Sequence, residues 1–544
     1  SIRRSSPSPQ EMSQSMLRSA FTTFIRKPLC ATTLVCVLAG VHGVARAEGL
    51  PELGDASEAS LSEPQERTIG RRIMIEIRGD RAFVEDAFLQ DYITNLGNRL
   101  VSASRGATNE NRREFEFFLL NDDTLNAFAL LGGFIGTHSG LVLATQTESE
   151  LAGVLGHEIA HILQRHQSRG AEAQRKGAPL QWIGLAAAIL AARSNSSSAG
   201  QATEAALATT AALQYQNQLD YSREFERESD RLGIQIMSRA GFDPMGMVGF
   251  FERLQRANRH NDGKAPGYLR THPLTTERIA DMQNRVDQMG VEGKRVLADN
   301  PEYRLAQARL RVLSMGANEA VAYFRTELAQ RTVLRNRADV YGLALALMRA
   351  REFNAAEKEL SAIRANRPPH AWLEALQAEI QFGRKQFTEA ISTYRAALQV
   401  FPYDRGLFYG YVDALYEAKQ VDAGITAVDE RLKNVQDDAM LYELAAKGYA
   451  LKDKRLLQHR SLGEAYFRRG NLHGAVEQME IAAKAKDGNF YEVSGAEARL
   501  RELKLAFRNR PLMPGEKRDS KRDKEDDEEQ DRRPPAEPAR RDGR

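Results

Sequence analysis

The sequence predicts an α+β domain, mainly helical with a small β-sheet, followed by an all-α solenoid of repeated helices. Three observations support this fold class. First, residues 151–161 carry two histidines four positions apart among apolar residues at helical spacing. Second, short runs of apolar residues that could form strands precede this segment. Third, a motif recurs every 34 residues later in the chain. At 544 residues the chain exceeds what one hydrophobic core usually contains, so we expect several domains.

Residues 1–47 have the features of an export signal. Residues 29–44 are mostly apolar, and Ala45-Arg-Ala47 fits a signal-peptide cleavage site. A positive region precedes them, formed by Arg18, Arg26 and Lys27. We expect cleavage before Glu48, with an N-terminal membrane anchor as the alternative. Both cysteines, Cys30 and Cys36, would be removed, so the mature chain would contain no disulfide and no thiol nucleophile.

The next elements are predicted from periodicity. Residues 67–100 alternate apolar and polar residues at helical spacing, with Gly79-Asp80 as an interruption. Residues 115–120 form a strand candidate, and residues 134–143 resemble a second strand that contains a turn. An edge strand of such a sheet could hold an extended peptide through its free main-chain groups.

The strongest chemical signal is the motif His157-Glu158-x-x-His161. Residues four apart share one face of a helix, so both imidazoles can bind one metal ion, and Glu158 can reach a water on the open side of that ion. Zinc lowers the pKa of its bound water to about 7, and a carboxylate beside that water can take its proton. A string of this kind also arises by chance, but here the apolar stripe of residues 151–162 shows a true amphipathic helix.

A catalytic zinc needs a third protein ligand, usually from another segment. Residues 221–239 resemble a second helix that ends at the stop signal Gly241-Phe-Asp-Pro244, and they contain Glu226-Arg-Glu-Ser-Asp230. Asp230 lies one helical turn beyond Glu226, where it could orient a ligand histidine.

These segments together resemble the gluzincin superfamily that holds the CAAX prenyl proteases and HtpX. The third ligand of that family is the first Glu of an ExxAD motif, and Ser229 stands here where the family usually has Ala. Two further pieces match: Asn126-Ala-Phe-Ala129 with Gly132 to Ile135 after it, and Thr271-His272-Pro273 with Arg278. The resemblance implies a zinc endopeptidase, and in that family the Gly132 to Ile135 region holds substrate as an added strand.

The resemblance also implies a division of roles. His157, His161 and Glu226 would hold one zinc ion, and Glu158 would act as general base and then proton donor. Candidate oxyanion donors are Asn126, His272 and Arg278. Alternatives stay open for three residues: Asp230 as a surface acid, Arg278 as an internal salt-bridge partner, and His272 as an inhibitory zinc ligand that blocks the open position.

Two other histidines are expected to play no part in metal binding. His138 lies in the second strand candidate and is expected to be a structural strand residue. His166 follows His161 by five positions, which rotates it away from the metal face of the helix, so we expect it to be exposed.

An apolar stretch lies between the two zinc segments. Residues 180–192 are strongly apolar but too short to span a hydrocarbon core, and residues 202–213 are rich in alanine. A buried helical hairpin is one reading. The other is a hydrophobic surface near the cleft, anchored by Trp182, that meets unfolded substrate or makes peripheral contact with a membrane.

From residue 301 the pattern changes to paired helices. The segments that begin at Phe353, Phe387 and Val421 recur at 34 residues, the tetratricopeptide period, so residues 301–508 should stack into a solenoid that binds peptides or proteins. A similar motif begins again at Asn471, which does not fit the interval of 34 from Val421. This mismatch suggests an inserted or degenerate helix between them. Residues 509–544 are charged and almost free of apolar residues, and we expect a disordered tail.

The domain order, a zinc protease at 48–300 before repeats, resembles a group of exported gluzincins that assist the assembly of outer-membrane β-barrel proteins. That resemblance implies a Gram-negative periplasm, substrates among unfolded or misfolded outer-membrane proteins, and contact of the repeats with the β-barrel assembly machinery. A chaperone or scaffold with a latent zinc site is the competing hypothesis. Nucleic acid is an unexpected partner, because the net charge is only +3 and no basic cluster is interleaved with aromatics.

Overall fold

The computed structural model describes residues 62–105, 113–173, 223–259, 267–289, 300–330 and 336–510. The predicted export signal, the apolar stretch at 180–213 and the charged tail beyond residue 510 lie outside these ranges. The described residues belong to one compact unit. Within the described ranges, every helix is too short or too polar to cross a bilayer.

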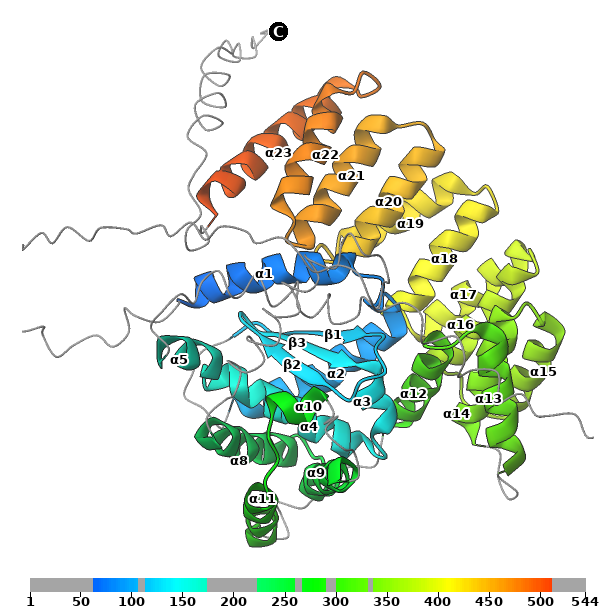
Figure 1. Cartoon of the computed structure of the whole chain (residues 1–544). Helices are drawn as coiled ribbons and strands as arrows, with labels where there is room; N and C mark the ends of the chain where they lie inside the picture. Colours follow the sequence, from blue (N-terminus) through cyan, green and yellow to red (C-terminus); the bar gives the residue numbers. More distant parts are fainter. Residues whose placement is uncertain are drawn as a thin grey trace, which may run out of the picture. The chain divides into compact units, whose positions relative to one another are not determined.

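A three-stranded sheet lies between helices in the N-terminal half (Figure 1). Its strands are β1 (Glu116–Leu120), β2 (Ala127–Leu130) and β3 (Phe134–His138). Successive side chains of a strand point to opposite faces. Phe118 and Leu120 therefore share an apolar cluster with α1 (Glu63–Gly79) on one face. On the other face the Phe117 ring lies against Gly97 of α2 (Ala87–Ser104).

The order of the strands corrects two expectations. β3 is the central strand, parallel to β1 and antiparallel to β2, so Gly132 to Ile135 leads into the middle of the sheet and offers no free edge. β1 and β2 are the edge strands, and no strand was predicted at β2. The predicted strand at 134–143 was also wrong beyond His138, because Ser139–Ala144 forms the short helix α3. A short apolar run fits a buried helical turn as well as it fits a strand.

Within the described ranges, the N-terminal half contains six further helices. In chain order they are α4 (Glu148–Leu163), α5 (His166–Ala173), α8 (Arg223–Arg239), α9 (Pro244–Arg259), α10 (Gly267–Thr271) and α11 (Thr276–Gln288). Of these, α4 and α8 carry the predicted metal ligands. The predicted second helix at 221–239 is confirmed from Arg223 to Arg239.

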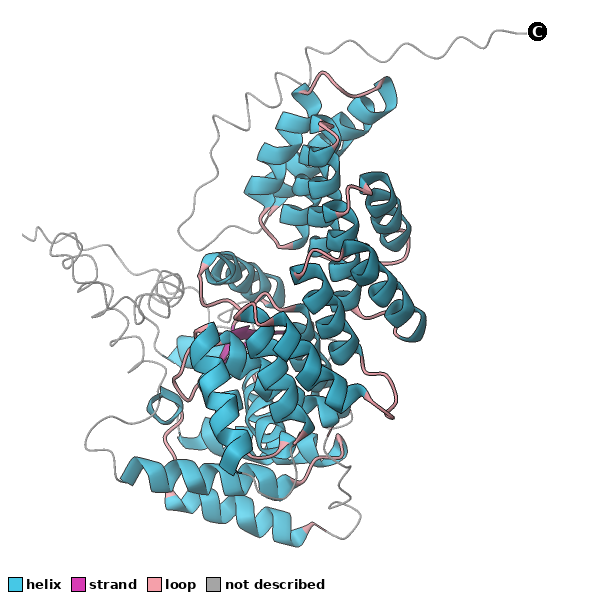
Figure 2. Cartoon of the chain, turned by 90° about the vertical axis from the view of Figure 1, so that its right-hand side faces the viewer, coloured by secondary structure: helices cyan, strands magenta, loops and turns pink. Residues whose placement is uncertain are grey.

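The C-terminal half is a stack of paired antiparallel helices (Figures 1 and 2). In chain order they are α12 (Pro301–Leu313), α13 (Ala317–Gln330), α14 (Arg337–Arg349), α15 (Phe353–Arg364), α16 (Ala371–Gly383), α17 (Phe387–Val400), α18 (Arg405–Glu417), α19 (Val421–Leu432), α20 (Ala439–Leu451), α21 (Arg455–Arg468), α22 (Leu472–Lys484) and α23 (Phe490–Asn509).

The helix starts confirm the 34-residue interval and correct one detail. The interval continues from Val421 at the start of α19 to Arg455 at the start of α21, with no inserted helix. Helix α22 begins at Leu472 and is the first helix of its pair. The first helix of the preceding pair, α20, begins at Ala439, 33 residues earlier, so the interval is one residue shorter here. The motif at Asn471 looked out of phase because it belongs to the other helix of the pair.

Helix α2 joins the sheet to the repeats. Arg309 of α12 pairs with Asp86, the residue that caps α2, at 2.7 Å between Nη2 and Oδ2. Further along α2, the Phe88 ring packs against Trp372 of α16. One buried apolar cluster runs from α2 through α12 to α18, so the two halves share a hydrophobic core.

Candidate metal centre

The two histidines of the motif lie on α4, a helix that is buried along its whole length. Thr147 caps this helix by accepting a hydrogen bond from the backbone N–H of Glu150. Gly156 faces α8, and a Cβ added to Gly156 would lie 3.2 Å from the carbonyl oxygen of Gly233. The two helices approach closely because both residues at this contact lack a side chain. Glu226 lies two turns before Gly233 on α8, which brings it beside the histidines.

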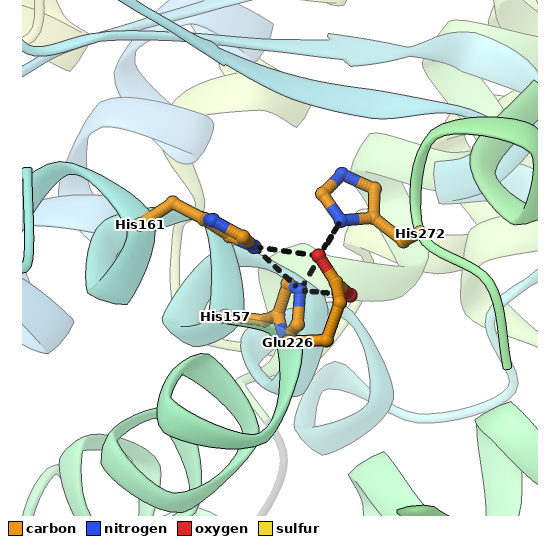
Figure 3. Close-up of side chains that lie close together, drawn as sticks. All are labelled: His157, His161, Glu226 and His272. Atoms are coloured by element: carbon orange, nitrogen blue, oxygen red, sulfur yellow. Dashed lines mark hydrogen bonds and ion pairs between the residues drawn. The ribbon is translucent and has the colours of Figure 1, made fainter. Parts of the chain in front are cut away.

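Four side chains converge on one point: the three predicted metal ligands and His272 (Figure 3). Nε2 of His157 lies 3.0 Å from Nε2 of His161 and 3.5 Å from Oε2 of Glu226. Nδ1 of His272 lies 3.0 Å from Oε1 of Glu226 and 3.4 Å from Nε2 of His157. All four side chains are buried.

These separations fit the ligands of a single metal ion. Nitrogen and oxygen ligands about 2.0–2.1 Å from a tetrahedral zinc ion lie about 3.3 Å from one another, close to the distances found here. Three imidazoles and one carboxylate are also the donor types that such an ion accepts. The cluster is therefore compatible with a bound metal ion.

Burial and neighbouring charges set the protonation of the cluster. Burial alone would lower the pKa of His157, but Asp230 and Glu226 raise it to about 9. Burial lowers the pKa of His161 well below its usual value. Burial also acts to raise the pKa of Glu226, but the three surrounding imidazoles hold it well below its usual value. A neutral His161 and an ionised Glu226 are the forms that bind metal, and a cation would compete with the proton on His157.

Glu158 reaches the same pocket from α4. Its Oε1 lies 3.5 Å from Nε2 of His272 and accepts no hydrogen bond from a described residue. The carboxylate is held by the backbone N–H of Ala129 on the edge strand β2. Burial raises the pKa of Glu158, which suits a group that has to take up a proton.

Asp230 and Arg278 form a support behind His157. Oδ1 of Asp230 lies 3.0 Å from Nδ1 of His157, the ring nitrogen that faces away from the cluster. Arg278 donates to both oxygens of Asp230 at 2.8 Å, and its Nη1 donates to the carbonyl of Pro273 at 2.6 Å. The structure therefore places Arg278 as an internal ion-pair partner that also holds the loop after His272.

The expectation that His166 is exposed was wrong. The ring is fully buried and stacks on Phe225, with ring centroids 4.4 Å apart. Nδ1 of His166 lies 3.0 Å from Nδ1 of His161, and its Nε2 lies 2.9 Å from Oε2 of Glu228. Extrapolating the helical wheel failed because α4 ends before His166, and Arg165 between the helices has a φ of 54° that redirects the chain.

These contacts fix which nitrogen of His161 faces the cluster. Burial lowers the pKa of His166 to about 4, so at neutral pH its ring is neutral and carries one N–H. Glu228 accepts the hydrogen bond from Nε2, which leaves Nδ1 of His166 as an acceptor. Its donors are the Nδ1–H of His161 at 3.0 Å and the hydroxyl of Ser229 at 3.3 Å. His161 then presents the lone pair of Nε2 to the metal position. No motif pointed to His166 or Glu228, and only their closeness in sequence to two ligands could have signalled them.

Helix α10 and the following loop place His272 in the cluster. The backbone N–H of Tyr268 donates to the carbonyl of Leu125 just before β2, and the Tyr268 ring stacks on the His272 ring with centroids 4.7 Å apart. The Tyr268 hydroxyl is buried and has no hydrogen-bond partner in the described ranges, a polar group that sequence reasoning missed. Asn126 is half-buried, packs near Gly267, and is not among the four clustered residues.

Comparisons with known proteins agree with this architecture. A model of peptidase family M48 matches residues 89–286, and a tetratricopeptide repeat model matches residues 381–448. The chain is 32% identical over 486 residues to the β-barrel assembly-enhancing protease of Escherichia coli (strain K12), which covers 88% of this chain and 97% of that protein. It is 36% identical over 330 residues to a putative β-barrel assembly-enhancing protease of Vibrio cholerae. This match covers 60% of this chain and 66% of that protein.

A shorter relative aligns over about half of the chain. The metalloprotease LoiP of Escherichia coli is 24% identical over 269 residues, which is 49% of this chain and 99% of LoiP. Among solved structures, a human IFIT1 dimer has a TM-score of 0.26 and 13% identity over 68% of this chain and 74% of that chain, which is too low to support an argument.

Proposed function

Since this chain belongs to peptidase family M48 and is a metalloprotease, we propose that it is a zinc endopeptidase of the Gram-negative periplasm. In this proposal it promotes the assembly of outer-membrane β-barrel proteins and degrades those that stall or misfold. The single observation that carries the enzymatic part is the convergence of His157, His161 and Glu226 on one point, with Glu158 beside it. Location, substrates and contact of the repeats with the assembly machinery rest on the relatives' printed names and on the export signal expected at 1–47.

The proposed mechanism assigns one role to each side chain. A zinc ion held by His157, His161 and Glu226 would supply a Lewis acid and lower the pKa of a water to about 7. Glu158 takes a proton from the attacking water at a carboxylate oxygen and passes it to the leaving amide nitrogen. Asp230 holds the His157 ring through Nδ1.

Substrate is proposed to bind along β2, the edge strand that lies beside the general base. Ala129 of β2 donates its N–H to Glu158 and accepts a hydrogen bond from Gln167, so a strand added there would replace these two contacts. Main-chain pairing of this kind reads little sequence, which suits an enzyme for unfolded chains.

Of the three candidate oxyanion donors, Arg278 is engaged with Asp230, which leaves Asn126 and His272. The Tyr268 hydroxyl is a further buried donor near the cluster.

One observation favours the competing function, a chaperone or scaffold with a latent site. His272 lies where a fourth ligand would close the open position, with Nδ1 3.0 Å from Glu226. In that state the centre could not admit a water, and the repeats would carry the function. The two proposals differ in whether an intact Glu158 is needed for outer-membrane protein assembly.

The test compares Glu158→Gln with Glu226→Gln in the full chain. Glu158→Gln should keep about one zinc per chain and lose cleavage of unfolded casein, whereas Glu226→Gln should lose most of the zinc, because removing a ligand weakens binding more than removing a base. Full zinc occupancy in the Glu226 variant would remove that residue from the ligands. Complete support of outer-membrane assembly by the Glu158 variant in cells would favour the chaperone function.

A further inference from the structure

The last repeats carry a surface that the protease site does not use. Two turns lie side by side at one end of these helices: the turn between α20 and α21, and the turn between α22 and α23 (Figure 1). A hydrogen bond connects them, from the backbone N–H of Leu456 to Oδ1 of Asp487 at 3.2 Å. We call six exposed side chains of these two turns the turn patch: Lys454, Arg455, Lys484, Lys486, Phe490 and Tyr491.

The aromatic part of the turn patch is unusually exposed. Phe490 is 79% exposed and Tyr491 is 84% exposed, with ring centroids 5.7 Å apart. Side chains of this size normally bury most of their surface, so an exposed adjacent pair marks an interaction site. The backbone beneath them is fixed, because Asn489 and Glu492 form a capping box at the start of α23. The two rings are therefore held outward by a rigid helix end.

The basic side chains of the turn patch form no ion pair with a carboxylate of the residues that the structure describes. They are Lys454, Arg455, Lys484 and Lys486. Neighbouring cations of the same helices are paired with acids: Lys452 with Asp422, Arg469 with Glu443, and Lys504 with Glu480. The same two turns carry two exposed carboxylates, Asp453 and Asp487, so the four cations leave a net charge of +2 near the two aromatic rings.

We propose that the turn patch binds the surface of a bilayer that contains anionic phospholipid. Aromatic side chains settle at the membrane interface, and Lys and Arg are attracted to anionic headgroups beside them. Helix turns at the end of the stack offer protruding side chains, which suits a flat bilayer better than a groove-bound peptide. The contact would hold the protease beside a membrane through exposed side chains. It is independent of the proposed function, since it uses no residue of the metal centre.

A matched control exists at another turn. Tyr403, between α17 and α18, is 86% exposed, but the arginines near it are engaged: Arg405 with Asp91, and Arg431 with the carbonyl of Pro402. Tyr403 is therefore an exposed aromatic residue whose neighbouring arginines already have partners, so it tests the effect of an exposed ring alone. Tyr403→Ser removes as much exposed ring as Tyr491→Ser and leaves the turn patch intact.

The experiment measures co-sedimentation of the full chain with vesicles of phosphatidylcholine, with and without phosphatidylglycerol. We expect binding to the anionic vesicles only, weakened by 0.5 M salt because salt screens exposed charges. The double variant Phe490→Ser/Tyr491→Ser should lower the partition coefficient at least tenfold. Replacing the four cations by Gln should abolish the preference for phosphatidylglycerol, and Tyr403→Ser should change nothing.

A second readout locates the contact. A Phe490→Trp variant should be quenched by brominated lipid in anionic vesicles, while a Tyr403→Trp variant should not. The proposal is overturned if the chain does not bind anionic vesicles, or if Tyr403→Ser weakens binding as much as the double variant does. It is also overturned if an acidic aromatic peptide binds the chain as tightly as the vesicles do and displaces it from them. The patch would then be a protein-binding surface. Because the variants alter exposed side chains only, casein cleavage should stay at the wild-type level throughout.

Discussion

The side chains of the metal centre divide into those that face the shared point and those that hold them in position. His157 and His161 each present Nε2 to the cluster, and each has a partner on its other ring nitrogen: Asp230 for His157 and His166 for His161. An imidazole binds metal well only when its other nitrogen is held, because that contact sets both the tautomer and the ring orientation.

His166 is therefore predicted to control metal affinity without touching the metal. His166→Phe keeps the ring stacked on Phe225 and removes both nitrogens, so Nδ1 of His161 loses its acceptor. We expect metal affinity about 10- to 100-fold weaker in competition with a chromophoric chelator. His459→Phe serves as control, because His459 bonds Gln478 in the repeats. Equal affinity in wild type and His166→Phe would show that the His161–His166 contact is only packing.

His272→Ala separates the two roles of that residue. If His272 closes the open position of the resting enzyme, its removal raises casein cleavage. If it donates to the oxyanion, its removal lowers turnover by about a hundredfold or more. We expect the rise, because Nδ1 of His272 lies 3.4 Å from Nε2 of His157, within the ligand cluster. Lower turnover at unchanged zinc content would contradict the closed resting state.

At the scale of single elements, the turn between β2 and β3 depends on backbone conformation. Gly133 has a φ of +90°, and a Cβ there would lie 2.0 Å from the carbonyl oxygen of Glu114. Gly133→Ala should lower the free energy of unfolding by at least about 1–3 kcal/mol, seen as a lower thermal midpoint. The control is Gly79→Ala at the end of α1, where a Cβ meets nothing within 4 Å and stability should be unchanged or slightly higher.

At the scale of the whole molecule, the junction between the two halves contains an acid with a raised pKa, Asp404. Asp404 caps α18, and burial together with the nearby Asp91 and Glu302 raises its pKa to about 6, against the hydrogen bond from Leu407. The folded state therefore binds this proton more tightly than the unfolded state, so stability falls as the pH rises from about 4 to about 6.

Asp404→Asn should flatten this part of the pH profile. Asn also caps helices, so the cap is kept while the buried charge is removed. Urea unfolding at pH 4.5, 5.5 and 7 should show the variant most stabilised relative to wild type at pH 7, with a smaller difference at pH 5.5 and the smallest at pH 4.5. A parallel loss of stability in both proteins across this range would mean that Asp404 does not control the junction.

Features that depend on residues close together in the chain could be predicted from the sequence. The spacing of His157 and His161 places both on one face of α4, because the helix repeats every 3.6 residues. The interval of 34 predicted the starts of α15, α17 and α19, because every repeat packs mainly against its neighbours. Fold class and metal chemistry could be predicted for the same reason.

Features that depend on contacts between distant segments could not be predicted from the sequence. Glu226 and His272 were named by family resemblance, but their meeting with His157 requires α4, α8 and the loop after α10 to pack together. The burial of His166 follows from one left-handed residue, Arg165, which no periodicity reveals. The position of β3 in the sheet is set by pairing on both sides, and strand order is a long-range property that alternation within one strand does not encode.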